Sequence, residues 1–197
     1  RQGTTSKTLD RAGGTGRDIE AILRAGKYFL FTAAMKGVIQ MQYRMKTHQL
    51  SQDEIHALLI KSLTGTISTI GPDGVPYSVP VHFVFLDGTI CFHGLPAGQK
   101  LDNLKANPHV CFTVYEMLGL LFDPNEKPCE TNTAYISAVI QGRAKLLEKQ
   151  EEKQRVLEAI VAKYTPQLVG RELPSNMVKG TAVVRISIDT MTGKYYQ

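Results

Sequence analysis

A two-residue turn joins two β-rich runs near the middle of the chain, and it constrains the fold more than any other feature. Asp87 and Gly88 separate the runs 75–86 and 89–94, both of which are rich in β-branched and aromatic residues. A tight hairpin turn requires positive φ at both central residues, which Asp-Gly tolerates. The sequence therefore predicts an antiparallel hairpin whose register is set by this turn.

The hairpin register brings two histidines and a cysteine onto one face. Counting from the turn, Val84 faces Cys91 and His82 faces His93. Because residues i and i+2 share a face of a strand, His82, Cys91 and His93 are expected to cluster, with facing Cβ atoms about 5 Å apart. The opposite face is apolar and is expected in the core; it holds Phe83, Phe85, Ile90 and Phe92.

Three interpretations of the histidine face are open. The first is a half-buried polar pair whose ring nitrogens are satisfied by backbone and water. The second is a cofactor-facing surface on which His93 contacts a ring. The third is a metal site of His82, Cys91 and His93, since His and Cys bind zinc and copper, although no fourth ligand is evident.

A glycine-containing loop follows the hairpin and leads into a short helix. Gly94 and Gly98 let backbone N–H groups approach an anion closely. The following helix points the positive end of its dipole at the same place, and Lys100 adds a compact positive charge in its first turn. The segment 94–100 therefore fits a phosphate group, although a plain connection with a solvated lysine has the same composition.

Patterns elsewhere predict six strands with helices at their connections. Ser51 and Glu54 form a capping box ahead of apolar residues at helical spacing. Gly142, inside a long strand pattern, predicts a bulge or the close approach of another backbone. The predicted elements are helix 51–62, strands 64–70, 75–86 and 89–94, helix 97–106, strand 109–117, loop 118–132, strand 135–147, helix 148–164 and strand 181–189. This order predicts a mainly β, α+β fold, a six-stranded antiparallel split or closed barrel with peripheral helices.

The first 40 residues differ from the rest in charge. Residues 1–40 hold seven Lys and Arg against three Asp and Glu, whereas the rest of the chain holds 16 against 15. The expected domain, 41–197, is thus nearly neutral, which argues against nucleic acid as a partner. Residues 1–40 are expected to be an extension that is partly disordered or forms a short helix at 18–26.

The cysteines and the apolar segments favour a cytoplasmic protein. Cys91, Cys111 and Cys129 are an odd set without CxxC spacing, which predicts neither a disulfide framework nor a structural zinc site. The apolar run 28–35 is eight residues long, far too short to span a membrane, so no membrane partner is expected.

Several motifs, taken together and in this order, resemble a known family. The longer segments are 65–114, 137–144 and 191–194; the shorter motifs are Phe92-His93, Gly98-Gln99-Lys100-Leu101-Asp102-Asn103 and Asn107-Pro108. The longer segments are similar to FMN-binding split-barrel proteins related to pyridoxamine 5′-phosphate oxidase. The shorter motifs resemble the 5-nitroimidazole-resistance (Nim) branch of that superfamily.

The resemblance implies a homodimer with one FMN at each end of the subunit interface. It also implies that Lys100 grips the FMN phosphate, as a lysine soon after the second hairpin strand does in the oxidases. The oxidases use an arginine and a lysine on the preceding strand, where this chain has Val79 and Val84, which argues against a vitamin B6 substrate. The expected cofactor-binding residues are Val79, Pro80, Val81, His82, Phe92, His93, Gly98, Gln99, Lys100 and Asn103.

The activity that the resemblance implies is an FMN-dependent oxidoreductase. Such a protein reduces a small nitroaromatic acceptor, of the 5-nitroimidazole type, with electrons from NADH or NADPH. Because nitro reduction consumes protons and histidine titrates near neutral pH, His93 is the expected catalytic residue. The alternative is a split-barrel protein that binds a flavin or a haem without turnover, which the missing basic side chains favour.

Overall fold

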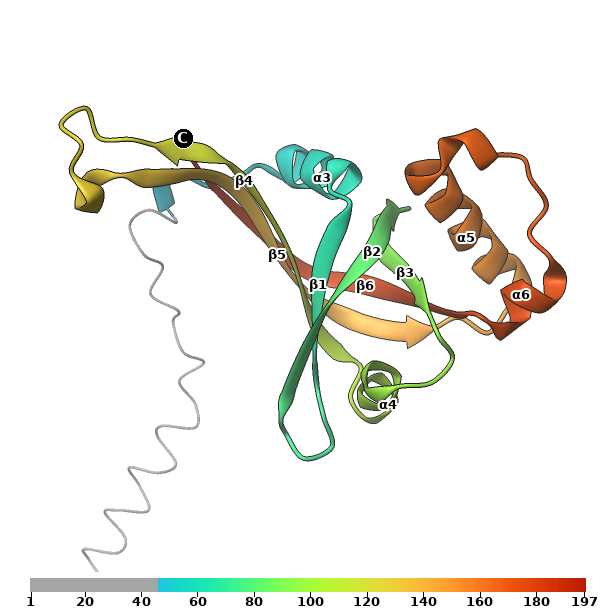
Figure 1. Cartoon of the computed structure of the whole chain (residues 1–197). Helices are drawn as coiled ribbons and strands as arrows, with labels where there is room; N and C mark the ends of the chain where they lie inside the picture. The colour runs from blue at the N-terminus through green and yellow to red at the C-terminus, as the bar shows by residue number, and fades with distance from the viewer. Residues whose placement is uncertain (1–45) are drawn as a thin grey trace, which may run out of the picture. The chain divides into compact units, whose positions relative to one another are not determined.

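Within residues 46–197, the part of the chain that the computed structural model describes, six antiparallel strands close into a barrel (Figure 1). The strands are β1 (Thr64–Ile70), β2 (Pro76–Leu86), β3 (Thr89–Gly94), β4 (His109–Leu121), β5 (Asn132–Leu146) and β6 (Ala182–Tyr196). Their order around the barrel is β1-β2-β3-β6-β5-β4. The predicted six-stranded antiparallel barrel is confirmed. The extension 1–40, with its expected helix at 18–26, lies outside the described residues.

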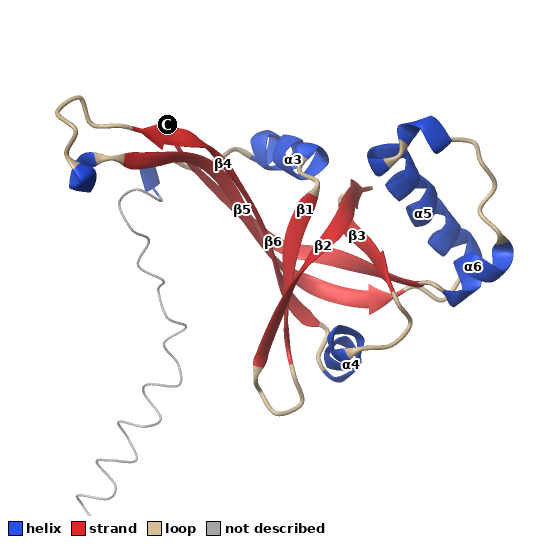
Figure 2. Cartoon of the chain, viewed as in Figure 1, coloured by secondary structure: helices blue, strands red, loops and turns tan. Residues whose placement is uncertain are grey.

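Four α-helices and two short 3-10 turns accompany the strands in residues 46–197 (Figure 2). The helices are α3 (Gln52–Lys61), α4 (Gln99–Ala106), α5 (Gln150–Tyr164) and α6 (Ser175–Gly180), and the turns are η1 (Pro128–Glu130) and η2 (Pro166–Leu168). The predicted capping box is present, since the Ser51 hydroxyl accepts the Glu54 N–H at 3.3 Å and the Glu54 carboxylate accepts the Ser51 N–H at 2.7 Å. α6 was not predicted, because six residues are too few to show a helical period.

β4, β5 and β6 are longer than the sequence pattern predicted. β4 continues to Leu121 and β6 to Tyr196, so the predicted loop 118–132 contains the end of a strand and η1. The pairing of β4 with β5 shifts register between Met117 and Gly119. Such a shift interrupts the alternation of polar and apolar residues by which strands are recognised. The sequence pattern therefore predicts a loop where the structure has the distal part of β4.

The turn of the β2–β3 hairpin has the predicted geometry. Asp87 and Gly88 both have positive φ, +49° and +70°. Val84 faces Cys91, as the two-residue turn requires. The local sequence therefore determines the register of the four residue pairs nearest the turn.

Beyond these four pairs the hairpin departs from the prediction. The ladder between β2 and β3 ends at Phe83 and Phe92, so the predicted pair of His82 with His93 is wrong. His82 pairs with β1, and His93 pairs with β6. The two strands part here because each continues along a different neighbour in the closed barrel.

The apolar face of the hairpin points into the barrel, as predicted. Phe83 and Phe92 are buried, and the Phe83 ring packs edge-on against Phe112 of β4 with ring centroids 4.9 Å apart. Phe85 is the exception on this face. It is only half-buried, and its ring packs against His56 of α3 with centroids 5.0 Å apart.

α5 covers the other face of the hairpin, on which the histidines and Cys91 were expected to cluster. Val84 and Cys91 are buried in one apolar cluster with Val156 and Ile160 of α5. Cys91 is fully buried and forms no part of an open surface. His82 stacks on Tyr164 at the end of the same helix, so it lies on the side of the hairpin that holds Cys91. The two histidines and the cysteine do not form one open surface, because this helix covers the centre of that face.

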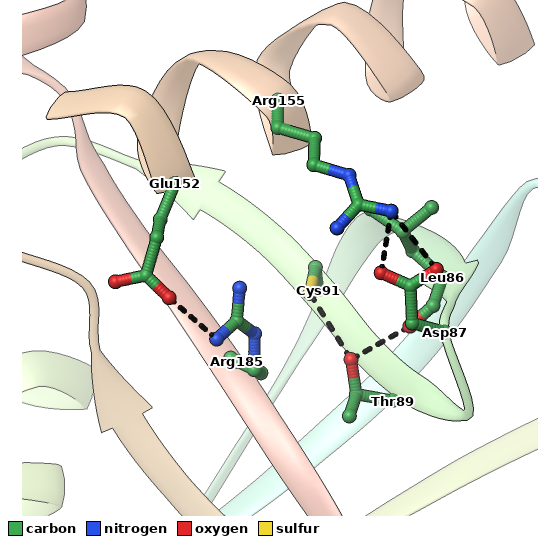
Figure 3. Close-up of polar contacts among 7 residues, drawn as sticks. All are labelled: Leu86, Asp87, Thr89, Cys91, Glu152, Arg155 and Arg185. Atoms are coloured by element: carbon green, nitrogen blue, oxygen red, sulfur yellow. Dashed lines mark hydrogen bonds and ion pairs between the residues drawn. The ribbon is translucent and has the colours of Figure 1, made fainter. Parts of the chain in front are cut away.

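Two ion pairs join α5 to the strands beneath it (Figure 3). Arg155 Nη2 lies 2.8 Å from Asp87 Oδ2 at the hairpin turn. Arg185 Nη1 of β6 donates to Glu152 Oε1 at 2.9 Å. Because exposed ion pairs contribute only about 0–1 kcal/mol each, the apolar cluster holds α5 in place and the ion pairs orient it.

Gly142 has both properties that its place in the strand pattern predicted. The pairing of β5 with β6 shifts register between Gln141 and Gly142. A Cβ built on Gly142 would overlap the backbone oxygen of Ser187 and lie 3.0 Å from a methyl carbon of Ile186. The position therefore has no room for a side chain.

Gly142→Ala should destabilise the protein by about 1–3 kcal/mol, because the added methyl group must displace the β6 backbone. Urea unfolding followed by circular dichroism measures the change in unfolding free energy. Gly180→Ala is the control, since nothing lies within 4 Å of a Cβ at that position. Equal unfolding midpoints for the two variants would contradict this prediction.

Candidate functional site

β2 changes partner part-way along its length, and the barrel opens there. Residues 76–82 pair with β1, whereas the pairing with β3 begins only at Phe83. Pro76 and Pro80 lie in the stretch that has no β3 partner, where a missing N–H is tolerated. The two prolines are thus the sequence signal for the opening.

The hydroxyl of Tyr164 lies at the point where β2 changes partner. Its oxygen accepts the N–H of Phe83 at 2.8 Å. The same oxygen lies 2.7 Å from the carbonyl oxygen of Leu63 and 2.8 Å from that of Phe83, and its proton can reach only one of them at a time. Burial raises the pKa of Tyr164. The last residue of α5 thus satisfies backbone groups of Phe83 and Leu63 just beyond the last pair of the β1–β2 ladder, a role that helix periodicity could not reveal.

A cleft of about 290 Å³ lies between the open stretch of β2 and the loop that leads into α4. It brings together five of the expected cofactor-binding residues: Val79, Pro80, Gly98, Gln99 and Lys100. Four further residues line it that were not expected: Tyr77, Leu95, Ala97 and Leu101. Tyr77 could have been found, because it is two residues from Val79 and so shares its face of the strand.

The N-terminus of α4 forms one wall of this cleft. Gly98 is the N-cap and has a φ of +132°, a conformation that favours glycine. Among the side chains of residues 46–197, none caps this helix end. Because the first N–H groups of a helix lack intrahelical acceptors and carry the positive end of the dipole, this wall is suited to an anion.

Lys100 places its ammonium group at the same wall. Its Nζ lies 4.8 Å from the centroid of the Phe92 ring. Burial lowers the pKa of Lys100. Within residues 46–197, no carboxylate forms an ion pair with this lysine. Lys100 is therefore a positive charge that the described protein does not neutralise.

The two histidines lie beside the cleft rather than in its lining. Both side chains are exposed, and the His82 ring packs against the Tyr164 ring with centroids 4.9 Å apart. The pKa of His93 is lowered by partial desolvation and by the charges of His82 and Lys100. Since the charge of Lys100 acts on His93, His93 belongs to the same electrostatic environment as the wall at the N-terminus of α4.

Asn103 lies away from the cleft and supports the helix that forms its wall. It is buried, and its amide donates to Thr69 Oγ1 at 3.0 Å. The Thr69 hydroxyl in turn donates to the carbonyl oxygen of Tyr77 at 3.2 Å. This chain of hydrogen bonds connects α4 through β1 to β2, and so positions Lys100 against the cleft.

The other expected residues occupy the barrel itself. Phe92 is a core residue whose ring meets the Lys100 ammonium, and Val81 packs against the same core. Val84, at the place of a basic residue in the oxidases, is buried beneath α5.

The described residues do not favour the metal interpretation of the hairpin histidines. No group of three or more His, Cys, Asp or Glu in residues 46–197 could hold a metal ion. The three cysteines, Cys91, Cys111 and Cys129, are free thiols. In the same part of the chain, no helix has the length and apolar character needed to cross a membrane.

Known proteins share both the sequence pattern and the fold. The sequence profile of a family described as pyridoxamine 5′-phosphate oxidase matches residues 51–195. A solved structure of a candidate 5-nitroimidazole antibiotic resistance protein from Bacteroides thetaiotaomicron is 25% identical, with a TM-score of 0.63 over 75% of this chain and 86% of that one. No curated protein sequence matches the chain.

Two further structures share the fold at lower identity. A flavocytochrome from Azotobacter vinelandii is 21% identical, with a TM-score of 0.70 over 82% of this chain and 75% of that one. An FAD- and haem-binding protein from Mycobacterium smegmatis is 19% identical, with a TM-score of 0.69 over 76% and 74% of the two chains. At these identities the likeness concerns the fold alone.

Lys100→Gln should raise the pKa of His93, because it removes one of the charges that disfavour the imidazolium. An NMR titration of the His93 ring protons measures this pKa. Lys105→Gln is the control, since that ammonium is exposed and pairs with Asp102 at 3.2 Å. An unchanged His93 midpoint in K100Q would contradict the proposed electrostatic coupling.

The same pKa sets the sign of a pH effect on stability. The folded pKa of His93 lies below its ordinary value of 6.5. As the pH falls through 6.5, the unfolded chain takes up this proton first, so His93 makes the folded protein less stable at lower pH.

Proposed function

The chain belongs to the pyridoxamine 5′-phosphate oxidase family of split-barrel proteins, and we propose that it is an FMN-dependent oxidoreductase that reduces small nitroaromatic acceptors with electrons from NADH or NADPH. One observation carries the proposal: a cleft along the open stretch of β2 is lined by a helix N-terminus and by a lysine, and no described side chain caps the helix end or forms an ion pair with the lysine. The rest of the lining is mainly apolar and includes a tyrosine.

The residues of the cleft fit a phosphorylated ring cofactor. Lys100 and the backbone at Gly98 and Gln99 supply the positive end for a phosphate. β2 from Tyr77 to Pro80 supplies apolar side chains, and its backbone can offer N–H and C=O groups to the edge of a flat ring. The cleft thus contains one basic side chain and a long apolar wall, a composition suited to a flavin mononucleotide.

A bound flavin supplies the redox chemistry, accepting a hydride and passing electrons to an acceptor. The chain's own residues hold the phosphate, orient the ring edge and control protons beside it. The pKa of His93 is lowered, so its imidazole is mostly neutral near pH 7 and accepts protons more readily than it gives them. Proton delivery by His93 therefore strengthens as the pH falls toward this lowered pKa.

Two observations favour a nitroaromatic acceptor over a vitamin B6 substrate. Val79 lines the cleft and Val84 is buried, so the two basic positions of the oxidases are apolar here. The likeness to the 5-nitroimidazole resistance protein covers most of both chains. The second candidate function is binding of a flavin or a haem without turnover, and the observation that favours it is that Lys100 is the single basic residue of the cleft.

FMN should bind to the purified protein, and Lys100→Ala should weaken that binding by about 1.5–3 kcal/mol, or roughly 10- to 150-fold, because one charge-assisted contact is lost. Quenching of FMN fluorescence measures the dissociation constant. With bound FMN and NADH or NADPH, the protein should consume a 5-nitroimidazole faster than free FMN does.

Lys105→Ala is the matched control for this experiment, because that lysine lies on the same helix but is exposed and ion-paired. An FMN affinity that is the same in K100A and K105A would show that Lys100 does not hold the phosphate. FMN binding without nitro reduction above the free cofactor would favour the binding protein over the enzyme.

We further propose that the protein is a homodimer formed through the outward face of β4 and β5. Tyr115, Met117 and Val139 are large apolar residues on these strands, and between 41% and 55% of each is exposed. The Tyr115 ring also stacks on Tyr135 with centroids 5.7 Å apart, which extends the apolar surface. Contiguous exposed apolar surface of this kind is typical of protein interfaces.

Val139→Asp should shift the protein from dimer to monomer, because an unpaired carboxylate would be buried in the interface. Sedimentation velocity measures the mass of the species in solution. Val75→Asp is a control, since that residue is also exposed but lies in the turn between β1 and β2. A protein that sediments as a monomer before any substitution would overturn the proposal.

A further inference from the structure

A second cleft, separate from the one described above, lies where α3 and α5 approach β2. Its volume is about 360 Å³, within the range of roughly 300–1,000 Å³ found for small-ligand pockets. Its lining residues are Ile60 of α3, Val84 and Phe85 of β2, and Ala159, Ala162 and Lys163 of α5. The two clefts share no lining residue.

The wall of this second cleft is apolar except for Lys163. The Lys163 Nζ lies 4.3 Å from the centroid of the Phe83 ring and 5.6 Å from that of the Tyr164 ring. It donates to the carbonyl oxygen of Leu59 at 3.3 Å. An ammonium group has three donors, and an aromatic face replaces only part of the solvation that burial removes.

No carboxylate of the described residues forms an ion pair with Lys163. Burial lowers the pKa of this lysine to about 8. The direction shows that the protein stabilises the charged form less well than water does. A negatively charged group placed beside this ammonium would restore the missing stabilisation.

We propose that this cleft binds an apolar monocarboxylate, such as a medium-chain fatty acid, with the carboxylate on the Lys163 ammonium and the hydrocarbon chain against Ile60, Phe85 and Ala162. A negative charge on the ligand suits Lys163, which has no ion-pair partner among the described residues. An apolar tail suits the other lining residues, all of which have apolar side chains. A phosphate-bearing cofactor fits this cleft poorly, because no helix N-terminus or second basic residue lines it.

Binding of a carboxylate beside Lys163 should depend on pH. Lys163 is mostly protonated below pH 8 in the free protein, and a bound carboxylate raises its pKa. Binding should therefore be strongest below pH 8 and weaken as the pH rises above that value. Above pH 8, each binding event should also take up a fraction of a proton from the buffer.

Titration calorimetry with octanoate as the probe tests the proposal. The wild-type protein should bind octanoate at pH 7 and bind it more weakly at pH 9.5, with proton uptake visible as a heat that depends on the buffer. Lys163→Met should lower the affinity roughly tenfold or more, because the charge-assisted contact is lost while the side-chain length is kept. Octanamide, which has the same shape and no charge, should bind more weakly than octanoate by a similar factor.

Two further variants test whether octanoate binds in this cleft or responds only to the overall charge of the protein. Lys61→Met removes a charge from the end of α3 outside the cleft and should leave octanoate affinity unchanged, because its ammonium is exposed and pairs with Glu116 at 3.4 Å. Ala162→Leu should weaken octanoate binding by narrowing the cleft, without changing the pH dependence. The circular dichroism spectrum and thermal midpoint of each variant should match those of the wild type, which shows that each is folded.

Equal affinity for octanoate and octanamide would overturn the proposal, as would binding that does not change between pH 7 and pH 9.5. These two measurements use the wild-type protein and so hold even if K163M fails to fold. Octanoate binding that K100Q abolishes, and K163M leaves intact, would assign the ligand to the first cleft and would also overturn the proposal.

Discussion

The change of partner along β2 is the constraint on which the rest of the site depends. A β-strand has two hydrogen-bonding edges, and buried backbone groups on both must find partners. From residue 76 to residue 82, β2 is paired with β1, while pairing with β3 is confined to the four residues next to the turn. Only part of β2 therefore takes part in closing the barrel on the β3 side. From residue 76 to residue 82, the edge of β2 that faces away from β1 has no strand partner within the described part of the chain.

α5 and the loop before α4 complete the surroundings of β2. The hydroxyl of Tyr164 accepts the Phe83 N–H and lies 2.7 Å from the carbonyl oxygen of Leu63, so α5 bridges β2 and the residue before β1 at the point where that ladder ends. Further along, the loop before α4 comes near the strand without pairing to it, and the cleft lies between them. The hydrogen bonds from Asn103 to Thr69 and from Thr69 to β2 hold α4 at this place.

Each of the two clefts has a lysine near one ring of the aromatic pair Phe83 and Phe92. Phe83 and Phe92 face each other across β2 and β3, and each ring has a lysine ammonium near it. Lys163 approaches Phe83 and Lys100 approaches Phe92, and burial lowers the pKa of both lysines. A ring face is a weak substitute for a carboxylate, and no carboxylate of the described residues pairs with either lysine, which is the basis of the two proposed anion sites.

Local features of the site could be predicted because short-range sterics determine them. The Asp87-Gly88 turn, the capping box at Ser51 and the close approach at Gly142 each depend on a few neighbouring residues, and the structure contains all three. The loop from Gly94 to Lys100 was likewise visible as a possible phosphate site from its glycines and its lysine. In each case the residue type permits a backbone geometry that few others allow.

The arrangement of the histidines could not be predicted, because it depends on contacts between distant parts of the chain. Extending the hairpin register one step too far placed His82 opposite His93, and nothing within β2 or β3 signals where their ladder ends. The position of α5 over Cys91 was equally hidden, since an amphipathic helix reveals its apolar face and not the surface on which it packs.

The sequence by itself determined the strands, their principal turn and the glycine-containing loop before α4, because these follow from backbone preferences over a few residues. Only the tertiary structure decided which edge of β2 stays open, which face of the hairpin α5 covers, and that Lys163 faces an apolar cleft. Those outcomes depend on how six strands share their hydrogen bonds in one closed ring, and that is a property of the whole chain.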